Sequence, residues 1–275
     1  MKKKFGKNLN EQNFLKLSII MAGIVMIFSS INSIFLSYRF PKVPSRELPS
    51  NIISTSLEDK KDEKNCDENT FIAESVVCEQ LEKPILPNMQ SVYEKNNDVV
   101  GWIKIDGTII DYPVMFTPDD GEFYLYKNFY KQKDINGSIF IDKHCHLDPR
   151  DTNLIFHGHN MNNGSMFGAL IKYKSKEFYE SHKQILFDTL YENQVYEVVS
   201  VFISKVYNMS DNVFKYYRFY NAKNQEEFNY FYENIKQLSL YDIATEAQFG
   251  DEFITLSTCE NTAKNGRFVV VAKKI

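Results

Sequence analysis

Eight short runs of apolar and β-branched residues, separated by turn-forming residues, occupy most of the last two thirds of this 275-residue chain. Asp106-Gly107, a hairpin-type dipeptide, lies between the first two runs. Closing a sheet of many short strands into a barrel pairs the backbone groups that edge strands would leave exposed. We therefore expect a mainly β fold in which eight strands form a closed or partly closed barrel. The expected strands are Val99–Ile105, Thr108–Met115, Gly137–Asp142, Asn153–His157, Gln184–Asp188, Gln194–Ser204, Glu252–Thr258 and Arg267–Lys273.

Two further segments have the spacing of helices that lie at the periphery of such a barrel. Ser165–Tyr173 follows the fourth strand, and Gln225–Leu238 precedes the last two strands. The second helix has one apolar face that should pack against the barrel. This face consists of Phe228, Phe231, Tyr232, Ile235 and Leu238. Met89 and Val92 also have helical spacing, so the folded domain is expected to cover residues 88–275.

The segment from Leu17 to Tyr38 carries no charged residue. As a helix its 22 residues would extend about 33 Å, enough to cross a hydrocarbon core of about 30 Å. Lysines precede it, so the positive-inside rule predicts that residues 1–16 are a cytoplasmic tail. The alternative is a cleaved signal peptide, but no two small residues are spaced as cleavage requires. Residues 17–38 are therefore predicted to be an uncleaved, single-pass membrane anchor.

Residues 39–87 are predicted to form an extracytoplasmic stalk, because they combine prolines with a charged run and show little periodicity. Cys66 and Cys78 lie in this stalk, where export permits them to pair or to remain free thiols. The net charge is −4 and there is no basic stripe with interleaved aromatic residues, so nucleic acid is not an expected partner.

Three chemically distinct side chains fall at strand ends. Cys259 follows the run ending in Thr258, Arg267 begins the next run, and His157 and His159 flank Gly158 after another strand. A thiol, an imidazole and a guanidinium are the groups that acyl transfer through a thioester requires. Each has a simpler alternative, namely a buried structural cysteine, a boundary histidine or a solvated arginine. Chemistry alone does not choose between the two histidines.

The combination of segments resembles class B sortases, the cysteine transpeptidases of Gram-positive bacteria, over residues 88–275. Thr255-Leu256-Ser257-Thr258-Cys259 is similar to the TLxTC signature of sortases. The histidine and arginine segments, Asn153–Asn160 and Gly266–Val270, also resemble theirs. Other segments that resemble the class are Val99–Ile105, Ile110–Val114, Gly137–Asp142 and Gly164–Phe167, together with the helix of residues 225–238.

This resemblance implies a role for each candidate residue. Cys259 would be the nucleophile, His159 the general acid, because it directly follows the glycine, and Arg267 a substrate-positioning or oxyanion group. His157, Ser257 and Glu260 would contact substrate, and the backbone N–H of Glu260 would be a second oxyanion donor. Some class B members have an acidic residue two positions after the cysteine. Here Asn261 occupies that position, which argues against a Cys-His-Asp triad.

The implied reaction is cleavage of a C-terminal sorting signal at threonine, followed by transfer of the acyl group to an amine of peptidoglycan or of a lipid-linked precursor. The expected partners are surface proteins that carry such signals, and the expected location is the outer face of the cell membrane. Two alternatives remain: a cysteine endopeptidase that releases its product to water, and an anchored binding domain with an inert Cys259.

No cofactor or metal is expected. His144-Cys145-His146 contains ligand-type residues, but a zinc site needs a third or fourth ligand at workable spacing, and none is evident nearby. We therefore interpret this tripeptide as part of a loop after the strand Gly137–Asp142.

Overall fold

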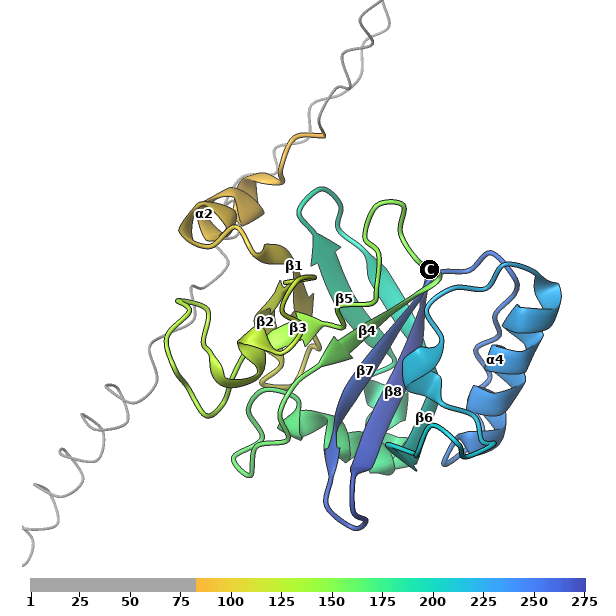
Figure 1. The fold of residues 1–275 in the computed structure, drawn as a ribbon. Helices are drawn as coiled ribbons and strands as arrows, with labels where there is room; N and C mark the ends of the chain where they lie inside the picture. Colours follow the sequence, from red (N-terminus) through yellow and green to blue (C-terminus); the bar gives the residue numbers. More distant parts are fainter. Residues whose placement is uncertain (1–82) are drawn as a thin grey trace, which may run out of the picture. The chain divides into compact units, whose positions relative to one another are not determined.

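The computed structural model describes residues 83–275, which fold as a closed barrel of eight strands (Figure 1). The strands follow one another around the barrel in the order β1-β2-β3-β4-β7-β8-β6-β5. Their bounds are β1 Val99–Lys104, β2 Asp111–Met115, β3 Ile139–Ile141, β4 Asn153–His157, β5 Gln184–Thr189, β6 Val195–Lys205, β7 Phe253–Glu260 and β8 Gly266–Lys274. All eight predicted strands are confirmed, with shifts at their ends.

The predicted membrane anchor at residues 17–38, the cytoplasmic tail, Cys66, Cys78 and most of the stalk lie outside the described residues. Within residues 83–275, no helix has both the length and the apolar composition needed to cross a membrane. At the start of this region the helix α2, Pro87–Lys95, buries Met89 and Val92 against β1. The backbone N–H of Leu86 donates to the carbonyl of Leu190 at 2.7 Å, so contacts with the barrel already begin before α2.

The outer face of the barrel is partly covered by the helix α4, Gln225–Leu238 (Figure 1). Its buried residues Phe228, Phe231 and Ile235 pack on a cluster that includes Val269 and Phe253. The predicted apolar face is thus confirmed at its centre, whereas Leu238 at the end of the helix is exposed. The helix begins where the side chain of an N-cap asparagine, Asn224, accepts a hydrogen bond from the backbone N–H of Glu227.

The segment Ser165–Tyr173, predicted as a helix, is instead a 3-10 helix, η2, over Gly168–Lys174. Leu170 and Tyr173 are both buried, and their spacing of three residues puts them on one side of a three-residue turn. Within the described residues, the other helices are the 3-10 helices η1, Phe123–Tyr126, and η3, Tyr216–Arg218, and the helix α3, Lys176–Ser181.

Alternation along β7 separates two environments. Ile254 and Leu256 point into the barrel core, whereas Phe253 points outward into the cluster under α4. Ser257 and Cys259 are on the outward-facing side by the same period of two. Because α4 covers only the start of β7, the outer face near the end of the strand is left for other loops to surround. This places the candidate site on the outside of the barrel wall.

Candidate active site

The histidine and cysteine segments come from two parallel neighbouring strands, β4 and β7. In their register His157 is opposite Ser257. Cys259 follows two residues later, still within β7, and His159 follows two residues later in the loop after β4. Both residues line the same cavity. This arrangement brings together two side chains that are 100 residues apart in the chain.

Hydrogen bonds fix these two segments to each other. The hydroxyl of Thr258 donates to the carbonyl of Gly158 at 2.7 Å, and the N–H of Gly158 donates to the carbonyl of Ser257 at 3.3 Å. On the other side of His159, the amide of Asn160 donates to the carbonyl of Cys259 at 2.9 Å. The backbone around the thiol is therefore held directly by the residues that flank the imidazole.

Arg267 lies directly across from Cys259 in the antiparallel pair β7–β8. Directly opposed residues point to the same face, with Cβ atoms about 4.5–5.5 Å apart. The guanidinium donates one hydrogen bond to the carbonyl of Gly266 at 2.9 Å and lines the same cavity as the thiol. Cys259 is a free and exposed cysteine.

Most of the predicted site residues line one cavity of about 560 Å³. Cys259, His159 and Arg267 line it together with His157 and Ser257. A second cavity of about 340 Å³ adjoins it, since Asp142, His144, His157 and Arg267 line both. Glu260 is not among the residues that line either cavity.

The imidazole of His159 is oriented by a segment that sequence reasoning missed. Its Nε2 lies 2.8 Å from the carbonyl oxygen of Leu125, and its ring packs at 5.5 Å from the ring of Tyr126. A carbonyl only accepts, so Nε2 must carry a hydrogen, and in the neutral ring Nδ1 is the nitrogen free to exchange a proton. Any residue type could supply this carbonyl, so the sequence holds no side-chain signal for it.

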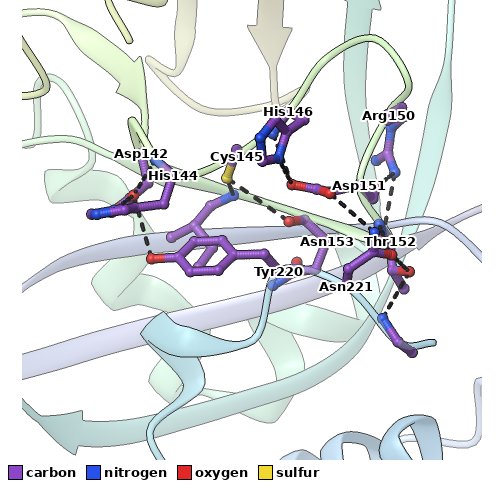
Figure 2. A network of polar contacts seen from close by, with 12 residues as sticks. Asp142, His144, Cys145, His146, Arg150, Asp151, Thr152, Asn153, Tyr220 and Asn221 are labelled. Carbon is purple, nitrogen blue, oxygen red and sulfur yellow. Dashed lines mark hydrogen bonds and ion pairs between the residues drawn. The ribbon is translucent and has the colours of Figure 1, made fainter. Parts of the chain in front are cut away.

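His157 is paired with a carboxylate, Asp142, at the end of β3. Its Nε2 lies 3.1 Å from Oδ2 of Asp142, and Nδ1 of His144 lies 2.8 Å from Oδ1. The hydroxyl of Tyr220 approaches the same carboxylate at 3.4 Å (Figure 2). Burial acts to raise the pKa of Asp142, but the hydrogen bonds from His157 and His144 outweigh it and hold that pKa well below its usual range. Asp142 is therefore a carboxylate at neutral pH.

Ser257 has its hydroxyl 2.8 Å from the hydroxyl of Tyr216, in a hydrogen bond in which either group can donate. Burial is the main cause that raises the pKa of Tyr216 to about 12. The phenol therefore stays neutral and keeps this contact at physiological pH. Ser257 is nearly fully buried, so it presents little surface to the cavity it lines.

Glu260, predicted to contact substrate, points away from the thiol because it is the next residue along the strand. Its buried carboxylate forms an ion pair with Lys174 of η2 at 2.9 Å and accepts hydrogen bonds from the N–H and hydroxyl of Thr262. The hydrogen bond from Thr262, followed by that from Lys174, lowers the pKa of Glu260 to about 2. The structure thus gives this side chain contacts that connect the end of β7 to η2.

Because its folded-state pKa is depressed, the Glu260 carboxylate should contribute stability above its unfolded pKa of about 4.3 and lose that contribution as the pH falls through about 2. We expect the free energy of unfolding of wild type to exceed that of Glu260→Gln at neutral pH, and the difference to shrink below about pH 4. Urea unfolding at a series of pH values measures the free energy of unfolding of each protein and therefore their difference. A difference that does not change with pH would contradict the ion-pair interpretation.

Gly158 is required because the space beside it is filled, not because the backbone turns there. Its φ is not in the left-handed region. A Cβ at this position would lie 2.4 Å from Cδ1 of Ile139 and 2.8 Å from the ring of Phe167.

We expect Gly158→Ala to destabilise the domain by about 1–3 kcal/mol, the usual cost of forcing extra volume into a packed core. Because the residue adjoins His159, activity should fall as well. Chemical denaturation measures the first effect. An unchanged midpoint of unfolding would show that Ile139 and Phe167 can move aside.

The side chains of His144, Cys145 and His146 form polar contacts with neighbouring residues (Figure 2). His146 pairs with Asp151 at 3.2 Å, and Cys145 is buried with its sulfur accepting from the N–H of Ile155 at 3.4 Å. Burial is the main cause that raises the pKa of Cys145 to about 12. In residues 83–275 no group of three or more His, Cys, Asp or Glu side chains is arranged to hold a metal ion.

Comparison with known proteins identifies the family. Residues 103–275 match the family model described as Sortase domain. The chain belongs to the sortase family. Sortase B of Staphylococcus aureus is 30% identical over 226 residues, which cover 82% of this chain and 89% of that protein. Sortase B of Listeria monocytogenes is 32% identical over 189 residues, or 68% of this chain and 74% of that protein.

Solved structures agree with this assignment. The Staphylococcus aureus sortase B-substrate complex has a TM-score of 0.62 and 33% identity, covering 70% of this chain and 87% of that one. A mutant form of Clostridium perfringens sortase B has a TM-score of 0.62 and 30% identity, covering 68% and 86%. The expected class B resemblance is confirmed. As a member of the sortase B group, this sortase is a cysteine transpeptidase of the kind that anchors surface proteins.

Proposed function

We propose that this sortase cleaves a C-terminal sorting signal at threonine through a thioester on Cys259, and then transfers the acyl group to an amine of peptidoglycan or a lipid-linked precursor. The observation that supports this most strongly is the register of β4, β7 and β8. It brings the end of β4, which His159 follows, beside the segment of β7 that carries Cys259, and it puts Arg267 directly across from the thiol. All three side chains line one cavity.

The proposed first half-reaction begins with the Cys259 thiolate attacking the threonine carbonyl. The guanidinium of Arg267 and the backbone N–H of Glu260 stabilise the developing oxyanion. His159, through Nδ1, protonates the departing amine, and the threonyl thioester remains on Cys259. In the second half-reaction an amine attacks the thioester, His159 takes a proton from its nitrogen, and the thiolate leaves. Two moderate steps replace one difficult displacement.

The proposed setting is the outer face of the cell membrane, because both substrates are located there. Residues 17–38 would serve as the single-pass anchor with the N-terminus in the cytoplasm, and residues 39–87 would serve as the stalk. This part of the proposal rests on the uncharged segment and its preceding lysines.

The test is mass spectrometry of a threonine-containing sorting peptide incubated with the enzyme, with and without triglycine. Transpeptidation predicts that the peptide is cut at threonine and that an amide adduct forms when the amine is present. Cleavage without any adduct would support a plain endopeptidase. Absence of both cleavage and labelling of Cys259 by a thiol-reactive peptide mimic would support an inert binding domain.

A further inference from the structure

The pair Asp142–His157 resembles the carboxylate–imidazole part of a proton-transfer system, but it is separate from His159. His157 lines the cavity that contains Cys259 and also the adjoining cavity. Its Nε2 lies within hydrogen-bond distance of the Asp142 carboxylate, which only accepts. In the neutral ring the hydrogen is therefore on Nε2. Within residues 83–275, Nδ1 of His157 has no hydrogen-bond partner, so the neutral ring has one free basic nitrogen at this wall.

The position of this pair relative to the thiol follows from the strand registers. His157 is opposite Ser257, two residues before Cys259, so it lies one strand over from the thiol position, at about 4.8 Å strand spacing, and about 6–7 Å back along the strand direction. Its side chain shares the outward face with Ser257. Phe140 packs against its ring at 5.4 Å, and Asp142 follows two residues later. The imidazole is thus held from two sides, by a ring and by a carboxylate.

The chemistry of transfer requires a second proton acceptor. An alkyl amine has a pKa of about 8–10 and therefore arrives mostly as an ammonium. To become an amide N–H it must lose two protons, and the neutral His159 left after the first half-reaction can accept only one. The other proton must go to a different base. The ammonium must also be attracted into a cavity that is lined by Arg267 and Lys143 and by four acidic side chains, Asp119, Asp120, Glu122 and Asp142. These carboxylates provide that attraction, and among them Asp142 is the one that pairs with His157.

We propose that His157, oriented by Asp142, is the group that captures the acceptor ammonium and removes its first proton. This inference rests on the proposed transpeptidase function. Nδ1 of His157 takes one proton from the ammonium nitrogen, whose freed electron pair forms the C–N bond with the thioester carbon. The second proton passes to His159 as the C–S bond breaks and Cys259 leaves as thiolate. His157 then returns its proton to water.

The test compares how the thioester is partitioned between water and an amine. For each enzyme form, the ratio of transfer to hydrolysis is measured with triglycine and, separately, with hydroxylamine, which is largely uncharged at neutral pH and needs no ammonium capture. A ratio is unaffected by the amount of folded enzyme and by the rate of the first half-reaction. The variants are His157→Phe, whose ring keeps the contact with Phe140, and Asp142→Asn, which keeps the shape of the carboxyl group.

We expect the triglycine ratio to fall about 10²-fold in both variants, the lower range for loss of a positioned general base, while the hydroxylamine ratio is retained. The KM for triglycine should rise as well. His146→Gln is the matched control, because His146 also pairs with an aspartate on the same loop but lines neither cavity. Its two ratios should equal those of wild type.

An unchanged triglycine ratio in His157→Phe would overturn the inference, and so would an equal loss with triglycine and hydroxylamine, which indicates general damage around the thioester. These results differ from a failure of the proposed function itself. In that case the wild-type enzyme would show no transfer to either amine, which would overturn both proposals together.

Discussion

Cys259→Ala will reduce cleavage of a sorting peptide by at least about 10⁴-fold, because the covalent route through the thioester is removed and the residual rate comes from binding alone. In a background that carries Cys66→Ser and Cys78→Ser, the intact mass after reaction with a thiol-reactive peptide mimic should show one adduct when Cys259 is present and none in Cys259→Ala. Cys259 is exposed in the cavity that also contains the candidate acid and the guanidinium, which is why it is the expected site of attack.

Cys145→Ala is the control for that experiment. Cys145 is free like Cys259, but it is buried, and its raised pKa keeps it a thiol. This variant should retain both the adduct and the cleavage rate. An adduct that persists in Cys259→Ala and disappears in Cys145→Ala would reverse the assignment of the nucleophile.

His159→Ala will reduce cleavage in the absence of added amine by about 10²–10⁴-fold, the range for loss of general acid–base catalysis. His157→Ala should weaken the same reaction much less, since the proposed role of His157 is in transfer. One peptide-cleavage assay, run at several pH values, measures the rate of each variant relative to wild type. The part of the pH dependence that comes from the proposed general acid should vanish in His159→Ala and persist in His157→Ala. Equal losses at the two positions would overturn the histidine assignment.

The sequence predicted the strands that carry the site well, because each has a clear apolar run. In the structure, alternation along β7 puts Cys259 on the outward-facing side of the strand. The same alternation puts Glu260 on the opposite face from the thiol, but the family resemblance suggested a substrate contact, and the ion pair with Lys174 was not foreseen. Lys174 belongs to a 3-10 helix 86 residues earlier, and nothing in one sequence indicates that pairing.

Contacts through backbone atoms or through strand pairing were the hardest to foresee. The carbonyl of Leu125 orients His159 from 34 residues upstream, and it has no residue-type signature. Asp142 reaches His157 because β3 pairs with β4, with Phe140 opposite His157. A single sequence suggests both strands but not their register. Knowledge of that register would have been enough to find the aspartate.

The place of β8 between β7 and β6 has a consequence for incomplete copies of this protein. A chain that ends before Gly266 would lack Arg267 and would leave two neighbouring strands with unsatisfied edges. Such a fragment should be catalytically silent even though it holds the thiol and both histidines. Adding the missing strand as a separate peptide should restore its pairing with β7 and β6 and supply Arg267. Recovery of activity on adding the peptide would therefore show that the barrel has closed and that the site is complete.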